Sequence, residues 1–467
     1  MTMRRIFSVG IVGGVLAVAV TTGGRDGAFR VEALAQSSQT DVTITLSNPA
    51  YHPKIGIPDF LINGGDAELA AAAKTVADVL WNDIDFEREY YVIPRAETAS
   101  IPVRPADSLP YQQWTDIGAD FVLVGSASRS GGDMAIELRL ISVRGETQGR
   151  QPFGARYPNC KVDNPRYCAH AIADDFHKQT KGLDGVARTK LAFSSDRDTG
   201  RVSGRPVQAG AQAKEIYLSD YDGANQRRFT VNRHLNIAPA WSPDGRLLAY
   251  TSWLTGPPDI YVANLAQPGR ALERPAHGSL AVQNWLPAWS PDGTKLAFVS
   301  TRAGNSDVWV VNRDGSGLQN LTNTPGIDSA PTWSPDGGKI AFTSDRAGTK
   351  QLWVMSANGT GKQLLVSQQV DRPTWSRLNF IAFTLGTGPG YEIAIYDFNT
   401  SSIRVLTDGR GKNESPAVAP NGRHVAFVTN RWGKEQIAIV DVAGGGIRQI
   451  TTTGNNDYPN WGPIPQP

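Results

Sequence analysis

The six-residue stretch AWSPDG occurs at residues 240–245 and again at 288–293, and TWSPDG occurs at residues 332–337. In each copy Pro presets φ for the second turn position, and Ser can hydrogen-bond back to the chain. Gly accepts the left-handed geometry that ends a hairpin loop. An extended stretch ending in Trp precedes each turn, and an apolar stretch such as Leu296-Ala297-Phe298 follows it. Each corner therefore predicts a strand, a tight turn and a second strand.

A third strand and a short fourth strand are predicted after each corner. In the second copy the third strand reads Asp307-Val308-Trp309-Val310, and a turn at Asp314-Gly315 leads to a fourth strand near Leu321-Thr322. Units of four short antiparallel strands, repeated roughly every 40–50 residues, are typical of the blades of a β-propeller.

The number of blades follows from the degenerate copies. The Trp position recurs at spacings of 48, 44, 42, 43 and 43 residues, namely at Trp241, Trp289, Trp333, Trp375, Val418 and Trp461. The second-strand signature also occurs six times, from Leu191-Ala192-Phe193 to Val425-Ala426-Phe427. The region begins with a second strand and ends with a first strand, Pro459-Asn460-Trp461. One blade shared by both ends would close the ring without a free sheet edge. We expect an all-β six-bladed propeller over residues 186–467.

The sequence pattern of residues 36–185 predicts a small α/β domain that precedes the propeller. Asp66 can cap a helix that runs to Trp81, and a last helix is expected from Tyr167 to Lys178. Strands are expected at residues 42–46, where Val42 and Ile44 alternate with Thr, and at 54–60, 121–125 and 134–141. The last two would pair across a turn at Gly131-Gly132.

The N-terminus has the features of a signal peptide over residues 1–35. Arg4 and Arg5 precede a largely apolar run from residue 6 to 20, and small residues favour cleavage after Ala35 or, alternatively, after Ala19. The run is too short to cross a bilayer, so we expect an exported, soluble protein. The net charge of +2 gives no indication of a nucleic-acid partner.

The sequence contains two cysteines, Cys160 and Cys168. In an oxidising compartment they favour a local disulfide, although two free thiols remain possible. A zinc site is not expected, because no second pair of ligands stands at a suitable spacing.

The order of these segments resembles the TolB family, the periplasmic proteins of the Tol-Pal envelope system. The resemblance covers roughly residues 41–467 and includes Ile57-Pro58-Asp59-Phe60 and the entry strand Thr189-Lys190-Leu191-Ala192-Phe193. Two corners depart from the pattern, at Trp375-Ser376-Arg377 and at Val418-Ala419-Pro420-Asn421-Gly422, and both look like turn variants.

The resemblance implies a scaffold that is not an enzyme and has no cofactor or metal. It implies that the propeller mouth binds the peptidoglycan-associated lipoprotein and that the mature N-terminus meets the inner-membrane protein TolA. By the same resemblance, the system maintains the outer membrane and assists its constriction during cell division.

Two enzymatic alternatives can be weighed against this reading. A prolyl-oligopeptidase-type hydrolase needs a G-x-S-x-G elbow, and the sequence contains no such pentapeptide. A metal-dependent propeller hydrolase would need oxygen or histidine ligands converging on the channel, but the six histidines show no metal spacing. The stretch from Asp220 to Asn225 is superficially similar to a calcium loop, yet its position in the repeat favours an ordinary hairpin turn.

Repeated residues are expected to be structural, and binding residues are expected where the blades differ. Arg197, Arg302, Arg346 and Arg431 each follow a second-strand aromatic by four residues and should brace the blades. Partner contacts are expected in the loops between a fourth strand and the next first strand, which mix charged, amide and aromatic groups. The candidate partner-binding residues, together with Val42 and Ile44 at the N-terminus, are His234, Asn236, His277, Trp285, Asp328, Arg372, Asn413, Glu414, Asn456 and Asp457.

Overall fold

In a computed structural model of the chain, the described residues are 52–64, 66–198, 213–267 and 273–465, together with three short strands nearer the N-terminus. The chain divides into two compact units, residues 1–165 and 166–467. The domain boundaries expected at residues 35 and 185 stay predictions. No helix in the described part of the chain is long and apolar enough to cross a membrane.

The first unit contains a six-stranded mixed sheet in the order β6-β4-β7-β8-β9, with β5 paired to β7. The short strands β4, β5 and β6 run parallel to their neighbours, whereas β7, β8 and β9 form an antiparallel meander. The strands are β4 (Lys54–Gly56), β5 (Leu61–Asn63), β6 (Tyr91–Val92), β7 (Phe121–Ser130), β8 (Asp133–Ser142) and β9 (Phe153–Cys160).

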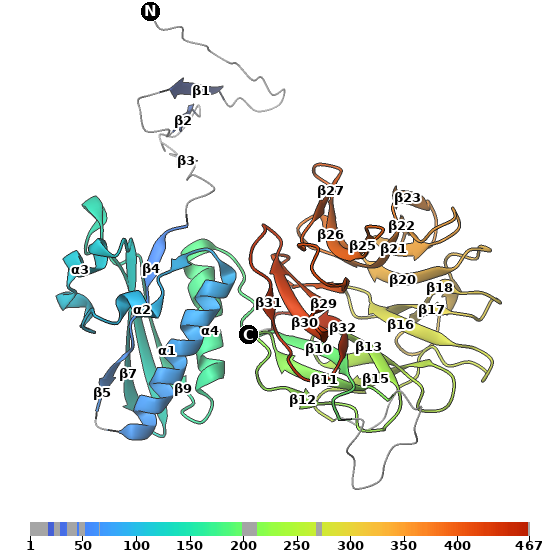
Figure 1. Cartoon of the computed structure of the whole chain (residues 1–467), viewed down its shortest axis with the longest axis horizontal. Coiled ribbons are helices and arrows are strands. Elements are labelled where there is room, and N and C mark those ends of the chain that lie inside the picture. The colour runs from blue at the N-terminus through green and yellow to red at the C-terminus, as the bar shows by residue number, and fades with distance from the viewer. Residues whose placement is uncertain are drawn as a thin grey trace, which may run out of the picture. The chain divides into compact units, whose positions relative to one another are not determined.

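Helix α1 (Ala67–Glu87) packs against β5, β6 and β7 (Figure 1). The Asp66 side chain caps it as predicted, accepting hydrogen bonds from the backbone N–H groups of Glu68 (2.9 Å) and Leu69 (3.2 Å). Shorter helical segments complete the unit: α2 (Arg95–Thr98), η1 (Ala106–Ser108), α3 (Tyr111–Asp116) and η2 (Gly145–Thr147).

Some element bounds in this unit differ from those expected. Helix α1 continues beyond Trp81 and ends at Glu87, followed by the C-cap residue Arg88, whose φ of 57° is left-handed. The strand expected at residues 54–60 ends at Gly56, because Pro58 has no N–H to donate to a ladder. Gly56 also lies beneath the Trp114 ring, where an added Cβ would come within 2.4 Å of a ring carbon.

Both cysteines are disulfide-bonded. Since the sequence has two, Cys160 and Cys168 are bonded to each other, which confirms the disulfide interpretation.

Three strands nearer the N-terminus form an antiparallel sheet of their own. Strand β2 (Phe29–Leu34) pairs with both β1 (Ala17–Thr22) and β3 (Ile44–Thr45). Ile44 therefore lies in a strand, while Val42 falls outside the described residues.

The second unit begins with α4 (Pro165–Lys181) and continues as the predicted six-bladed propeller (Figure 1). Each blade is one antiparallel sheet. The blades, numbered from the one that closes the ring, are blade 1 (β32-β10-β11-β12), blade 2 (β13-β14-β15), blade 3 (β16-β17-β18-β19), blade 4 (β20-β21-β22-β23), blade 5 (β24-β25-β26-β27) and blade 6 (β28-β29-β30-β31).

The first strand of each blade lies innermost and contacts the first strands of both neighbouring blades. These inner strands are β32 (Asn456–Trp461), β13 (Asn236–Trp241), β16 (Asn284–Trp289), β20 (Asp328–Trp333), β24 (Val370–Trp375) and β28 (Asn413–Val418).

The second strands carry the Leu/Ile/Val-Ala-aromatic signature, and their central side chains are buried. They are β10 (Lys190–Ser195), β14 (Leu247–Ser252), β17 (Lys295–Ser300), β21 (Lys339–Ser344), β25 (Phe380–Gly386) and β29 (His424–Trp432).

The third strands pair with the second strands, and the outer fourth strands are short. The third strands are β11 (Glu215–Asp220), β15 (Asp259–Asn264), β18 (Asp307–Asn312), β22 (Gln351–Ser356), β26 (Tyr391–Asp397) and β30 (Lys434–Asp441). The fourth strands are β12 (Arg227–Arg228), β19 (Gln319–Asn320), β23 (Gln363–Val366), β27 (Ser402–Val405) and β31 (Arg448–Gln449).

Blade 2 has an isolated bridge between Val262 and Glu273 where the other blades have a fourth strand. The fourth strand expected in blade 3 near Leu321-Thr322 lies two residues earlier, in β19.

The ring closes as predicted from a repeat region that begins with a second strand and ends with a first strand. Strand β32, from the C-terminal end, pairs with β10, so that Leu191 lies opposite Trp461 and Ser195 opposite Asn456. Blade 1 is thus built from both ends of the propeller sequence, and β10 has a partner along each of its edges.

Candidate protein-binding site at the propeller mouth

The inner strands line a central channel, and each carries a bulge at its third residue. The register of each inner strand against its second strand shifts at this point. The residue at the bulge has a left-handed φ between 48° and 56° and is followed in every blade by a proline. The six bulge residues are Ala238, Leu286, Ala330, Arg372, Ser415 and Tyr458. The proline has no N–H to donate, and a bulge is one of the few strand positions that tolerate it.

Two cavities occupy the channel. One, of about 530 Å³, is lined by the tryptophans and prolines of the corners. The other, of about 340 Å³, opens on the face that bears the loops joining second to third strands and fourth to first strands. Arg372 and Tyr458 line both cavities, and the Arg372 guanidinium lies 3.8 Å from the centre of the Tyr458 ring. This pair therefore lies where the two cavities approach each other.

The second cavity defines the propeller mouth, and the side chains around it are unevenly distributed. The second residue of each inner strand is half-buried there, and these six residues are Ile237, Trp285, Ser329, Asp371, Glu414 and Asp457. The apolar ones belong to the adjacent blades 2 and 3, whereas the acidic ones belong to the consecutive blades 5, 6 and 1. The mouth therefore has an apolar side, extended by Trp253 and Leu286, and a charged side.

Two of the three acidic residues have a lysine partner. Lys350 Nζ lies 3.2 Å from a carboxylate oxygen of Asp371, and Lys214 Nζ lies 3.9 Å from one of Asp457. The side chain of Glu414 has no hydrogen bond or ion pair among the described residues.

Burial raises the pKa of the Glu414 carboxyl above its usual range. The nearby charges of Asp457 and Glu435 act in the same direction, while Lys412 and Arg372 oppose the shift. The ionised form of Glu414 is consequently less well compensated than a solvent-exposed carboxylate would be.

Six of the predicted partner-binding residues lie on this face with accessible side chains. Trp285, Arg372, Glu414 and Asp457 belong to the inner strands at the mouth, and His234 is exposed in the loop before β13. His277 is also exposed, although its Nδ1 lies 3.2 Å from Asp259, a buried carboxylate at the start of β15.

The other four predicted residues of the propeller are buried. Asn236, Asp328, Asn413 and Asn456 are each 0% exposed and stand first in their inner strands. Their side chains form hydrogen bonds with neighbouring blades and loops, so they support the structure of the mouth and are not accessible to a partner. The sequence suggested that these residues bind a partner because it does not distinguish a polar side chain that faces solvent from one that is buried against a hydrogen-bonding group.

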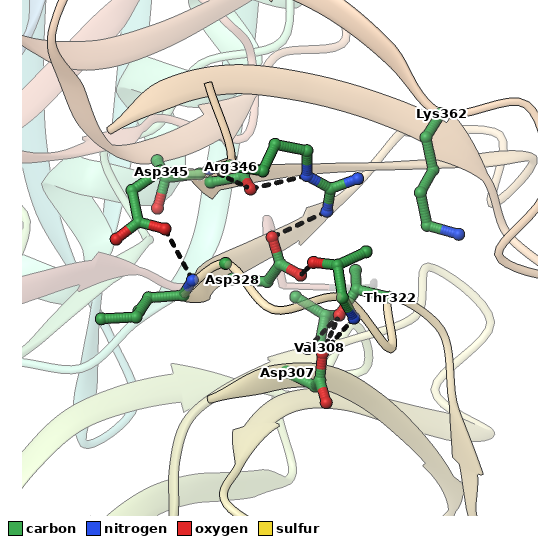
Figure 2. Close-up of polar contacts among 12 residues, drawn as sticks. Asp307, Val308, Thr322, Asp328, Asp345, Arg346 and Lys362 are labelled. Atoms are coloured by element: carbon green, nitrogen blue, oxygen red, sulfur yellow. Dashed lines mark hydrogen bonds and ion pairs between the residues drawn. The ribbon is translucent and has the colours of Figure 1, made fainter. Parts of the chain in front are cut away.

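Asp328 shows how such a residue is held (Figure 2). Arg346 Nη2 donates to Asp328 Oδ1 at 2.8 Å, and the Thr324 hydroxyl donates to Asp328 Oδ2 at 3.0 Å. The backbone N–H of Thr324 donates to Asp307 Oδ1 at 3.3 Å, and the Thr322 hydroxyl donates to the same oxygen at 3.0 Å. The donors to both carboxylates offset the desolvation cost of burying them.

The four repeated arginines brace the blades, as predicted. Besides Arg346, Arg197 donates to Asn456 Oδ1 at 2.8 Å and Arg431 donates to Asn413 Oδ1 at 3.2 Å. Arg302 donates to the carbonyl oxygen of residue 276 at 2.5 Å. Each guanidinium thus ties the end of a second strand to the start of the inner strand or to the loop before it.

One group of side chains among the described residues is close enough to hold a metal ion, namely His170, Asp220 and Asp222. Its carboxylates already have cationic partners: Lys190 forms an ion pair with Asp220, and Arg166 lies 2.5 Å from Asp222. The stretch from Asp220 is a hairpin turn, in which the N–H of Asp220 donates to the carbonyl of residue 224 at 2.9 Å. The turn interpretation is confirmed.

Both parts of the chain match family models. The TolB amino-terminal domain matches residues 41–149, and the TolB beta propeller domain matches residues 178–465, more than half of the chain.

The curated proteins similar to the chain include the Tol-Pal system protein TolB of Desulfosudis oleivorans, which is 34% identical over 232 residues, or 48% of either chain. The Tol-Pal system protein TolB of Pseudomonas entomophila is 29% identical over 238 residues, or 50% of either chain. The chain thus spans about half the length of the curated relatives it matches. The crystal structure of TolB from Acinetobacter baumannii superposes with a TM-score of 0.73 at 22% identity, covering 89% of this chain and 98% of that one. At this identity the similarity establishes the fold.

Proposed function

This chain belongs to the TolB family, and from that premise we propose that it is a periplasmic scaffold of the Tol-Pal system. It binds the peptidoglycan-associated lipoprotein at the propeller mouth and TolA through its mature N-terminus. Through these two interactions it helps to maintain the outer membrane and to constrict it during cell division.

The observation that carries the proposal is the presence of both TolB family domains, in the expected order, in one chain. The propeller mouth supports the first interaction, since it combines a cavity of about 340 Å³ with aromatic and charged groups. Interfaces between proteins commonly combine an apolar centre with a polar rim. The proposal includes no catalytic step.

The pairing of β3 supports the second interaction. Its partner strand β2 (Phe29–Leu34) lies within the predicted signal peptide, so cleavage after Ala35 would remove β1 and β2. The edge of β3 would then be open for a strand of TolA to add to it.

Affinity capture tests the lipoprotein interaction. The chain would be immobilised without residues 1–35 and exposed to detergent-solubilised envelope, with a Trp285→Ala variant beside it. Leu364→Ala is the matched control, because Leu364 is exposed on the outer strand β23 and does not line the mouth cavity. We expect the wild type and the control to retain the lipoprotein and the Trp285 variant to lose most of it. Failure of the wild type to retain any envelope lipoprotein would overturn the proposal.

A further inference from the structure

Neighbouring blades meet at six junctions, which we call seams. At five of the six, hydrogen bonds on the mouth face connect the two blades. In four of them an Asn at the start of an inner strand donates to a carboxylate or amide oxygen at the start of the preceding blade's third strand. The pairs are Asn236 with Glu215 (3.1 Å), Asn284 with Asp259 (2.9 Å), Asn413 with Glu392 (3.0 Å) and Asn456 with Gln436 (3.0 Å). In the fifth seam Thr324 bridges Asp307 and Asp328.

The seam between blades 4 and 5 lacks this bridge in the described part of the chain. Its inner strand begins with Val370, which has no polar side chain, and Gln351 on the preceding blade donates to the carbonyl of residue 367 instead. Blade 5 also lacks the bracing arginine, because Thr387 stands at that position.

A pocket of about 170 Å³ occupies this open seam. Gly386 helps to keep it open, because a Cβ there would lie 3.0 Å from the Gln369 side chain. The seam pocket is lined by Lys350, Asp371 and Arg372, which also line the mouth cavity, and by Tyr391 and Glu414. At ~30 Å³ per water molecule, its volume corresponds to roughly six waters. It therefore has room for the end of one long side chain entering from the mouth.

The charged side chains that line the seam pocket determine whether a cationic or an anionic group would be favoured inside it. Lys350 is paired with Asp371, and the Arg372 guanidinium stacks on Tyr458. The Glu414 carboxylate has no ion pair or hydrogen bond among the described residues, although the charges of Lys412 and Arg372 are near it. An entering cation would find an unused acceptor in Glu414, whereas an entering carboxylate would face Glu414 and would compete for Lys350.

We propose that the seam pocket receives a lysine or arginine side chain of the protein bound at the mouth, with Glu414 as its counter-charge. This inference rests on the proposed function, because it concerns the same bound partner. An apolar residue next to that cation in the partner would lie against Trp253 and Trp285 across the mouth cavity.

The test measures the affinity of the purified periplasmic domain of the peptidoglycan-associated lipoprotein by calorimetry. Glu414→Gln keeps the side-chain shape and removes the charge, and Glu414→Lys reverses it. Glu273→Gln is the control, because Glu273 is an exposed carboxylate that lines a different cavity beside the 293–294 and 312–315 turns. Melting temperatures verify that all variants are folded.

We expect Glu414→Gln to raise Kd about tenfold or more, the usual loss for one hydrogen bond to a charged group, and Glu273→Gln to leave Kd within twofold. Wild-type affinity should also fall as the pH is lowered and Glu414 takes up a proton, while the Gln variant should lose this dependence. Exchanging each lysine and arginine of the lipoprotein domain for Glu should reveal one position at which Glu414→Lys restores binding.

The outcomes separate this inference from the proposed function. If the wild type binds the domain and both Glu414 variants bind equally well, the seam pocket is not a cation site. Tighter binding by Glu414→Lys would mean that an acidic group enters, which also overturns the inference. Absence of wild-type binding would instead reject the proposed lipoprotein interaction, and the inference with it.

Discussion

At the scale of single residues, the recurring corner serves both the hairpin and the contact between blades. The Ser242 hydroxyl accepts the N–H of Leu247 at 2.9 Å and donates to Asp244, which fixes the turn. The indole of Trp289 donates to the carbonyl of residue 240 in the preceding blade at 3.1 Å, and that of Trp333 donates to the carbonyl of residue 288 at 3.2 Å. Trp289 and Trp333 therefore each stabilise their own blade and its attachment to the blade before it.

Trp289→Ala should lower the free energy of unfolding by about 3–5 kcal/mol, because it removes a large buried ring and an inter-blade hydrogen bond. Trp432→Ala should change it by less than about 1 kcal/mol, since Trp432 is 43% exposed. Urea unfolding followed by fluorescence and circular dichroism measures both. Equal effects of the two substitutions would contradict the structural role of the corner tryptophan.

The folding stability of the protein should depend on pH through His177 on α4. Burial, assisted by the charges of Arg423 and Lys181, lowers the pKa of this imidazole from 6.5 to about 3. Below pH 6.5 the unfolded chain takes up a proton at His177 while the folded protein does not. Stability is therefore fully present above pH 6.5 and is lost as the pH falls toward 3, at most by about 1.4 kcal/mol per pH unit.

Replacing His177 with Phe should flatten this part of the stability profile, whereas the same replacement at the exposed His234 should not. Chemical unfolding at pH 7.5, 5.5 and 4.5 gives the comparison. A His177→Phe profile with the wild-type slope would show that His177 is not the group responsible.

At the scale of elements, closure depends on β32. This strand covers the edge of β10, buries Trp461 and places Asn456 where Arg197 can reach it. Without it, β10 would present a free edge to solvent and to other chains.

Deleting residues 455–467 should therefore lower the melting temperature substantially and promote aggregation, as measured by differential scanning calorimetry and light scattering. Deleting residues 465–467 is the control, because it leaves β32 complete. Wild-type melting and solubility in the longer deletion would refute the shared-blade closure.

Much of this architecture could be predicted from the sequence because turn chemistry is local. Pro and Gly at fixed offsets identified the hairpins, and the phase of the repeat identified the closing strand. The prolines of the inner strands, such as Pro239 and Pro459, are a sequence signal for the channel bulges, which the alternation of apolar residues alone does not predict.

The candidate site was less predictable because it depends on contacts between blades. Whether an Asn faces solvent or a neighbouring carboxylate is decided by residues about 20 positions away, such as Glu215 for Asn236. The seam pocket likewise depends on Val370, which stands where the other inner strands begin with Asn or Asp. The absence of a polar side chain at this position can be recognised as important only by comparison with the other five seams.

At the scale of the whole molecule, the proposal assigns two partners to two parts of the chain. Deleting residues 36–40 and introducing Ile44→Pro removes a ladder donor at the N-terminus without altering the propeller. We expect this variant to lose TolA binding and to keep lipoprotein binding in parallel pull-downs. If both interactions survive, or both are lost, the two regions do not act separately.

Binding of the lipoprotein at the propeller mouth can be measured by site-specific photo-crosslinking in living cells. A benzoylphenylalanine would replace Trp285 at the mouth or, in a second strain, Leu364 on the outer strand β23, which is 44% exposed. If the lipoprotein binds at the mouth, we expect a crosslink to the peptidoglycan-associated lipoprotein from position 285 and none from position 364. A crosslink from position 364 with none from position 285 would contradict it.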